Sequence, residues 1–276
     1  MNGLTKEDDT KKMQQNEEPL KTKTQLKSLN RALHVLEYIA EHSGRAVDIC
    51  EGLKISWATL HRTLQQLEQD GFLSKDPETN RYRVGPRAWF IGSTYLAIHP
   101  VLEPARPYLD RASLNSSITV QLVERSKKQA TVLYNSHSEN SVTRAAVGYH
   151  FPLHAGSKGQ VLLAYAPNQF IEDYISGDLT KLTKTTEIDA KSLLKRLKKI
   201  RSDGYACTIG DVQVFSGSIA APIFNRDNNV VACVCFVTKK SILQNITKLD
   251  ILVEQLIETT QNISISLGWH PNSIQP

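Results

Sequence analysis

Apolar side chains recur at helical spacing near the start of the chain. After Ser28, a residue type that often caps a helix, apolar residues return every three or four positions. They are Leu29, Ala32, Leu33, Leu36, Ile39 and Ala40. Residues 1–26 are polar and charged, and such a segment buries too little surface to offset the entropy lost on ordering. The pattern predicts a flexible tail over 1–26 and a helix that begins at Ser28.

Two shorter helices and a hairpin are predicted next. The expected elements are helices over 47–53 and 57–69, a turn over 54–56, and strands over 72–74 and 82–84. Gly71 is placed to end the second helix, and the turn-forming residues 76–80 separate the two strands. Helix, turn, helix and hairpin in this order predict a winged helix-turn-helix domain over 27–85.

An aromatic helix is predicted after the hairpin. Pro86 suits a first helical turn, and Trp89, Phe90 and Tyr95 follow it. Because a connecting helix this apolar needs a partner surface, we interpret 86–102 as a linker helix that dimerises the chain.

The remaining residues, 103–272, mix strand and helix patterns, which predicts a separate α+β domain. Predicted strands cover Ile118–Val123, Ala130–Tyr134, Val142–Val147, Ser218–Phe224 and Val230–Val237. Predicted helices cover Ser157–Ala166, Asp189–Asp203 and Ile246–Leu267.

Charge is mild overall but positive where DNA contact is expected. The 276 residues carry a net charge of +5, and residues 31–90 hold eight basic and eight acidic residues. Within 52–66, however, Lys54 and Arg62 are the only charged residues. No apolar run approaches the roughly 18 residues of a membrane span. We therefore expect a cytoplasmic protein without a membrane partner, whose four cysteines are reduced.

The helix over 57–69 leaves polar side chains for a groove-binding surface. Arg62 can donate to guanine or phosphate, Gln65 or Gln66 can read adenine, and Thr59 can hold phosphate. The candidate DNA-binding residues are Lys54, Trp57, Thr59, His61, Arg62, Gln65, Gln66, Arg81 and Arg83. A helical bundle that only mediates protein contacts is the alternative, and the order of helices and wing disfavours it.

Four ordered blocks of sequence resemble the IclR family of bacterial regulators. They are SLNRALHVLEYIAE, TLHRTLQQLEQDGFL with YRVG, FPLHAGSKGQVLLAY, and DGYACTIGDVQVFSGSIAAPIFNRDNNVVACVCF. The resemblance implies a winged helix-turn-helix, a dimerising linker helix and a GAF- or profilin-like effector-binding domain. It further implies operator binding as a dimer or a dimer of dimers, and control by a small organic acid or aromatic compound.

The resemblance also implies an effector pocket. Its expected residues are Ala155, Gly156, Ser157, Lys158, Gly159, Asp211, Ser218 and Cys235. A small-residue turn that enters a helix can present backbone N–H groups to a carboxylate, although a tight packing turn is the alternative. Thr208–Gly210 lack the acids of family members that bind small oxo-acids, and Ser218 and Cys235 also depart from the usual residues. These departures predict a drier pocket and a larger or less polar effector.

The cysteines allow a second hypothesis. Cys233 and Cys235 alternate on one strand and share a face, which suits either two small core residues or a redox pair. A GAF-like cysteine-dependent redox enzyme or thiol sensor, with Cys207 as resolving partner, is therefore the alternative function. We favour a repressor without catalytic activity, and we expect no cofactor and no metal, because metal-ligand spacings and nucleotide loops are missing from the sequence.

Overall fold

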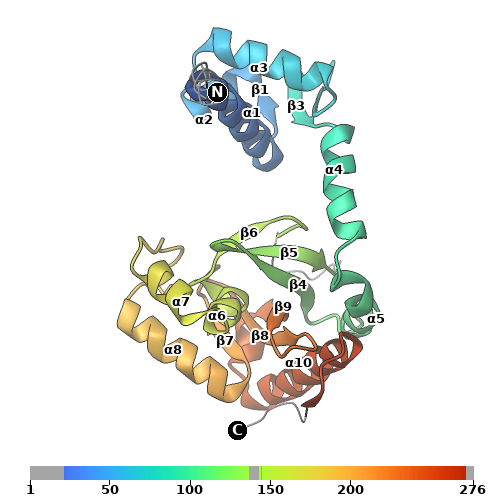
Figure 1. Cartoon of the computed structure of the whole chain (residues 1–276), viewed down its shortest axis with the longest axis vertical. Coiled ribbons are helices and arrows are strands. Elements are labelled where there is room, and N and C mark those ends of the chain that lie inside the picture. Colours follow the sequence, from blue (N-terminus) through green and yellow to red (C-terminus); the bar gives the residue numbers. More distant parts are fainter. Residues whose placement is uncertain (1–21, 137–142, 144, 272–276) are drawn as a thin grey trace, which may run out of the picture. The chain divides into compact units, whose positions relative to one another are not determined.

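The computed structural model describes residues 22–136, 143 and 145–271, with side chains from Lys27 onward. The chain divides between Ala97 and Ile98 into two compact units (Figure 1). This division falls inside the segment 86–102 that the sequence assigns to a linker.

The first unit is a small winged helix-turn-helix domain. Its helices are α1 (Thr22–Glu41), α2 (Ala46–Leu53) and α3 (Trp57–Gln69), and its strands are β1 (Gly44–Arg45), β2 (Leu73–Lys75) and β3 (Arg81–Val84). The antiparallel sheet has the order β1-β3-β2. One apolar core joins the helices to the sheet: Val35, Ile39, Ile49, Leu60, Leu64, Leu73 and Tyr82. The amphipathic spacing of the helices therefore produces the predicted packing.

One boundary in this unit is wrong in the sequence-based prediction. The helix α1 already includes Thr22, so Ser28 lies inside it instead of capping it. Residues 22–26 are helical and do not belong to a tail. The low apolar content of this turn hid it, because polar residues such as lysine and glutamine are good helix formers without leaving an apolar stripe. The predicted tail up to residue 21 lies outside the described residues.

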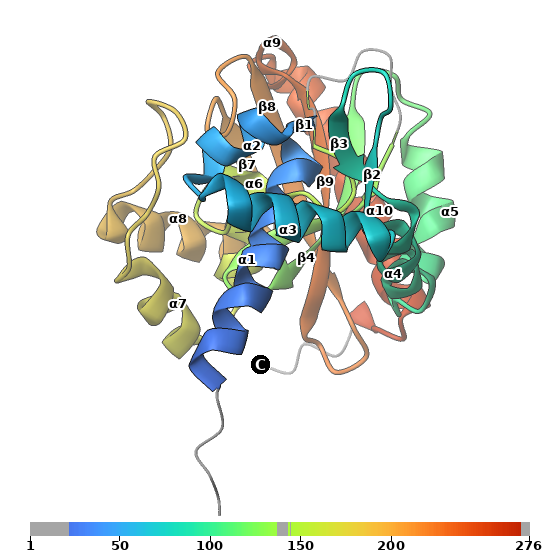
Figure 2. The same ribbon diagram turned by 90° about the horizontal axis from the view of Figure 1, so that it is seen from above.

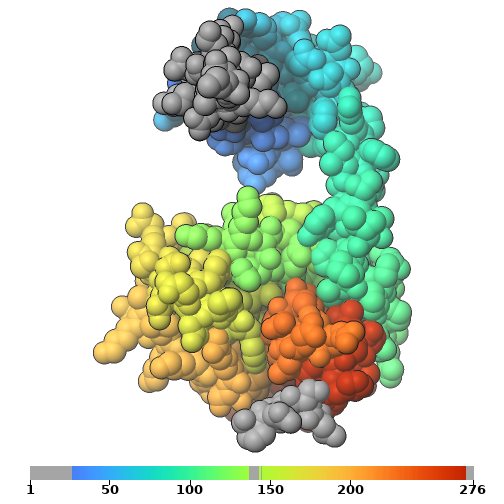
Figure 3. All heavy atoms as spheres, in the orientation of Figure 1, coloured from blue at the N-terminus to red at the C-terminus, as the bar shows by residue number. Residues whose placement is uncertain are grey.

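The helix α4 (Pro86–Ala97) follows the wing and buries none of its residues. Trp89 is 71% exposed and Phe90 is 67% exposed. In the space-filling view the α4 side chains form a column that extends from the wing (Figure 3). The Trp89 and Phe90 side chains of the predicted linker helix are thus largely solvent-exposed within their own unit.

The second unit is an antiparallel sheet with helices on both faces. Its strand order is β6-β5-β4-β9-β8-β7. The strands are β4 (Thr119–Ser126), β5 (Gln129–Asn135), β6 (His150–Pro152), β7 (Ala206–Ile209), β8 (Ser216–Phe224) and β9 (Val230–Lys239). The helices are α5 (Leu102–Ala112), α6 (Gly156–Ala164), α7 (Asn168–Ile175), α8 (Ala190–Asp203), α9 (Lys240–Leu243) and α10 (Ile246–Ser266). Figure 2 shows α7 and α8 on one side of the sheet and α5 and α10 on the other.

The predicted α+β class is confirmed, but one strand was misplaced. The expected strand over Val142–Val147 is not formed by its described residues, and Val142 and Arg144 lie outside the description. The third strand is instead β6, which begins at His150, two residues after Gly148 turns the chain with a φ of +87°. Apolar alternation alone did not locate that turn. The pattern also missed β1, α7, β7 and α9, which are all short.

In the described part of the chain, no helix is both long enough and apolar enough to cross a bilayer.

Candidate DNA-reading surface and effector pocket

The helix α3 presents one polar face outward. Leu60 and Leu64 are fully buried. Because successive residues are rotated by about 100°, Arg62 points about 200° away from Leu60. Gln65 lies beside Arg62 on this outward side, and both are exposed. We call these two side chains, together with Thr59 and Gln66, the reader surface.

Thr59 and Gln66 extend the reader surface toward α1. A shallow groove of about 370 Å³ between the two helices is lined by Arg31, Thr59, Arg62 and Gln66, among others. Ser56 Oγ donates to Thr59 Oγ1 at 2.9 Å, and Gln66 Nε2 donates to Asp70 Oδ2 at 3.0 Å. These bonds hold the two side chains in place at the edge of the helix, whereas Arg62 and Gln65 have no hydrogen-bond partner among the described residues.

Trp57 and His61 lie on the opposite flank of α3. Their rings contact each other with centroids 6.1 Å apart, and Trp57 is 51% exposed. Lys54 ends α2 in the left-handed conformation, at a φ of 53°, and is exposed in the turn before α3. The predicted candidates on and before this helix therefore lie on its exposed or half-exposed surface.

The wing holds its two predicted arginines differently. Arg81 and Arg83 are both exposed on β3. The Arg81 guanidinium donates to the Ser43 carbonyl next to β1, so part of its donor set is already used. The hairpin turn is ordered by Asp76 Oδ1, which accepts from the backbone N–H groups of Glu78 and Thr79. These bonds hold the pKa of Asp76 below its usual range.

The turn that enters α6 is tightly packed. Gly156 has a φ of +74°, and a side chain there would meet Val212 Cγ2 at 2.8 Å. A Cβ on Gly159 would meet the backbone carbonyl oxygens of Pro152 and Leu153, each at 2.8 Å. Ala155 is the fully buried N-cap residue. The packing interpretation of these small residues therefore holds, whatever else the turn does.

Asp211 caps α6 and does not line the cavity described below. Its Oδ2 accepts from the Gly156 N–H at 3.0 Å and from Gln160 Nε2 at 3.1 Å. Burial raises the pKa of Asp211, and the Gly156 N–H opposes that rise. Thr186 Oγ1 donates to the Asp211 carbonyl at 2.7 Å. The sequence predicted that the Gly156 N–H group could bind an effector carboxylate. In the structure this group already donates to Asp211.

Ser157 and Cys235 form a buried cluster with neighbouring strands. Ser157 Oγ donates to Ser218 Oγ at 2.8 Å and lies 3.7 Å from Cys235 Sγ. Ser218 Oγ also lies 3.3 Å from Thr208 Oγ1. Ser157 and Cys235 are both inaccessible. They therefore fix α6 to the sheet, and an effector-binding role for them stays a prediction.

A cavity of about 350 Å³ opens beside this cluster, and we call it the effector cavity. Of the eight predicted pocket residues, Lys158 and Ser218 line it. The other described lining residues are Thr143, Ala145, Tyr149, His150, Phe151, Pro152, Leu182, Val212, Gln213, Ser216 and Val237. Sequence reasoning missed these residues because they come from segments far apart in the chain and carry no common motif.

Among the described residues of that lining, Lys158 is the one strongly charged group. Only 5% of the residue is exposed, although it is a lysine. Its Nζ donates to Gln121 Oε1 at 2.7 Å and lies 3.7 Å from the centroid of the Phe151 ring. Burial lowers the pKa of Lys158, and the nearby thiols of Cys235 and Cys233 oppose that change.

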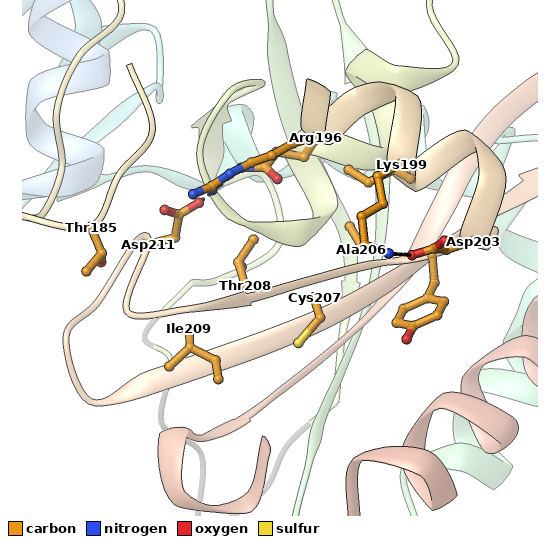
Figure 4. Close-up of a pocket in the computed structure, with 12 residues that line it drawn as sticks. Thr185, Arg196, Lys199, Asp203, Ala206, Cys207, Thr208, Ile209 and Asp211 are labelled. Carbon is orange, nitrogen blue, oxygen red and sulfur yellow. Dashed lines mark hydrogen bonds and ion pairs between the residues drawn. The ribbon is translucent and has the colours of Figure 1, made fainter. Parts of the chain in front are cut away.

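A larger hollow of about 640 Å³ lies between α8 and β7 (Figure 4). Its charged groups already have partners. Lys199 Nζ bonds Asp203 Oδ2 at 2.6 Å, Arg196 Nη2 lies 3.5 Å from Glu187 Oε2, and Asp211 caps α6. The charged groups that line this hollow are therefore already engaged by other groups of the protein.

The buried thiols are unsuited to redox chemistry. Cys233 and Cys235 are fully buried, and burial raises the pKa of both thiols. Because the thiolate is the reactive form, these residues behave as small apolar side chains. All four cysteines are free.

Comparison with known proteins places the chain in a family. Residues 93–265 match the profile described as bacterial transcriptional regulator IclR, C-terminal, and residues 28–77 match the IclR helix-turn-helix domain. The chain belongs to the IclR family. It is therefore a DNA-binding transcriptional regulator with an effector-binding C-terminal domain, and the family is one of regulators and not of enzymes.

Full-length relatives and solved structures agree with this assignment. The transcriptional repressor AllR of Salmonella typhi is 27% identical over 251 residues, covering 88% of this chain and 91% of that protein. The repressor YiaJ of Escherichia coli K12 is 24% identical, covering 88% of each. An IclR homologue from Microbacterium hydrocarbonoxydans, solved with 4-hydroxybenzoate, is 26% identical with a TM-score of 0.74, covering 87% of this chain and 98% of that one. The IclR of Thermotoga maritima shares the fold, with a TM-score of 0.71 over 88% of this chain and 100% of that chain, at 22% identity.

Proposed function

We propose that this IclR-family chain is a bacterial repressor that acts in the cytoplasm. It binds operator DNA through α3 and the wing, and an organic acid bound in the effector cavity changes that binding. The observation that carries the proposal is the outward face of α3, where Arg62 and Gln65 are exposed and have no hydrogen-bond partner among the described residues. AllR and YiaJ, which match along most of this chain, are both named repressors.

The chemistry of the reader surface suits the major groove. A guanidinium can donate two hydrogen bonds to guanine, and a glutamine amide can do the same to the N6/N7 edge of adenine. Lys54, Arg81 and Arg83 are exposed and would contact phosphates on either side. Trp57, Thr59, His61 and Gln66 complete the proposed interface, with Thr59 and Gln66 held by bonds to Ser56 and Asp70.

The active form is proposed to be a homodimer or a dimer of dimers. The helix α4 exposes Trp89, Phe90, Ile91 and Tyr95, each at least half accessible. Several large exposed apolar side chains on one helix favour an interaction site, and a palindromic operator needs two reading heads.

The effector is proposed to be an organic acid with an apolar or aromatic body. The effector cavity has aromatic and aliphatic walls from Tyr149, Phe151, Leu182, Val212 and Val237. Its polar lining residues are Thr143, His150, Lys158, Gln213, Ser216 and Ser218. Its volume of about 350 Å³ lies at the small end of the range for ligand sites. The homologue solved with 4-hydroxybenzoate binds a compound of this chemistry.

A selection of bound fragments from genomic DNA tests the operator proposal. The selected fragment should bind the full-length protein at nanomolar concentration, and Arg62→Ala should weaken that binding by about 1–3 kcal/mol. Lys128→Ala is the matched control, because Lys128 is exposed on the β4–β5 turn of the other unit. Fluorescence anisotropy measures both. Equal affinity of Arg62→Ala and wild type for the fragment would remove α3 from the interface.

A further inference from the structure

The position of Lys158 is unfavourable for a positive charge in three ways. The residue is buried, the only hydrogen-bond partner of its ammonium among the described residues is the neutral Gln121 amide, and it lies in the first turn of α6. Burial of an ammonium without a counter-charge costs free energy, and the N-terminus of a helix is itself positive. In the described part of the chain, no carboxylate lies within ion-pair distance of this ammonium.

The carboxylate of Asp211 does not compensate this charge. It bonds the Gly156 N–H and Gln160 Nε2, and the groups that act electrostatically on Lys158 are the Cys235 and Cys233 thiols. Gln121 is itself held, since its Nε2 donates to Asn135 Oδ1 at 2.8 Å. The amide therefore presents its carbonyl oxygen to Lys158, and the ammonium keeps donor capacity for a further acceptor.

The walls next to Lys158 are aromatic and apolar. Tyr149 and Phe151 contact each other with ring centroids 4.9 Å apart, and both line the effector cavity. None of the described lining residues is acidic. Among these described residues, an anionic ligand would meet the positive charge of Lys158 and no negative charge.

We propose that the Lys158 ammonium recognises the charge of the effector, and that the effector is an aromatic monocarboxylate. The carboxylate binds Lys158 in the effector cavity, and the ring of the ligand packs against Tyr149, Phe151 and Val212. This inference rests on the proposed function, because it assigns the chemistry of the same cavity. The anion-binding element is then the Lys158 side chain and not the backbone N–H groups of the α6 turn.

Isothermal titration calorimetry on the full chain, without DNA, tests this assignment. Benzoate and benzamide have nearly the same shape and differ in charge, so wild type should bind benzoate at least about 10-fold more tightly. Lys158→Met should lose this preference and bind the two compounds equally, whereas Lys158→Arg should retain it. Lys199→Met is the matched control and should behave as wild type, since Lys199 is paired with Asp203 on the surface of α8.

Three outcomes would overturn the assignment: benzamide binding as tightly as benzoate to wild type, a benzoate preference that survives Lys158→Met, or binding of glyoxylate but not of benzoate. Should Lys158→Met not fold, Lys158→Gln keeps a polar side chain of similar length and answers the same question. Because the calorimetry contains no operator, its failure leaves the DNA-binding proposal standing. If wild type did not bind an operator fragment, the DNA-binding proposal would be overturned and the assignment of Lys158 would not.

Discussion

The reader surface and the effector cavity are built in opposite ways. The reader surface comes from one helix of 13 residues, and its polar side chains are exposed or half-exposed. The effector cavity collects residues from loops, strands and one helix between Thr143 and Val237, and the strong charge of its described lining, on Lys158, is buried. Substitutions at the reader surface should therefore change binding and leave stability intact. Substitutions around the cavity should change stability and binding together, because the same atoms do both.

The largest effect is expected from substitutions in α4, which should change dimerisation and leave the reader surface and the effector cavity unaltered. Asp at Trp89 and Tyr95 together would place two charges on the apolar face of α4, and we expect the dimer to dissociate. Operator affinity should fall by about 100-fold or more, because two linked heads bind far better than one. Sedimentation at micromolar concentration should show dimer for wild type and monomer for the variant. Leu114→Asp, at an 84% exposed position of the other unit, is the control. A wild-type monomer would contradict the dimer proposal.

The next prediction concerns packing around the cavity. Gly159→Ala places a Cβ 2.8 Å from two backbone carbonyl oxygens, which cannot rotate away. We expect the C-terminal unit to lose about 2 kcal/mol of unfolding free energy. Gly177→Ala is the control, because its Cβ would lie 3.5 Å from the nearest atom and needs no φ in the left-handed region. Urea denaturation followed by circular dichroism compares the two. Equal stability of both variants would show that the α6 turn can relax.

The smallest effect is a pH dependence that comes from Lys158. Burial lowers its pKa in the folded state below the ordinary value of 10.5, so the unfolded chain holds the proton more tightly. Between the folded pKa and 10.5 the unfolded state binds more protons, and stability therefore rises with pH across that window. Lys158→Met should lack this rise. At neutral pH and without ligand it should be about 1 kcal/mol more stable than wild type, because an apolar side chain replaces an uncompensated buried charge. A destabilised Lys158→Met would mean that its bond to Gln121 outweighs the cost of burial.

The same contrast explains what could be predicted from the sequence. The apolar spacing of Leu60 and Leu64 defines the inward face of α3, so Arg62 and Gln65 are exposed by elimination. Family resemblance located the α6 turn, and Lys158 and Ser218 do line the cavity. Neither the apolar spacing nor the family resemblance placed Tyr149 or Phe151 in the cavity lining. The position of these two residues beside the cavity depends on the pairing of β5 with β6.

Two further features could not be read from local pattern. The bond from Arg81 to the Ser43 carbonyl depends on β1, a strand of two residues that is too short to leave any periodicity. Asp211 was expected in the pocket, but its partners Gly156 and Gln160 lie 55 and 51 residues earlier in the chain. Long-range contacts of this kind are fixed by the tertiary fold, and a linear sequence shows only the residue types that make them.

The segment between β7 and β8 connects two spaces that would otherwise be independent. Asp211 borders the hollow beside α8, whereas its neighbour Val212 borders the effector cavity and abuts Gly156. If a molecule that displaces Val212 also moves Asp211, the carboxylate that holds the first turn of α6 shifts, and the rim of the second space shifts with it. By thermodynamic reciprocity, occupancy on either side then alters affinity on the other by the same factor. Two compounds of unrelated chemistry could in this way be read out as one combined signal.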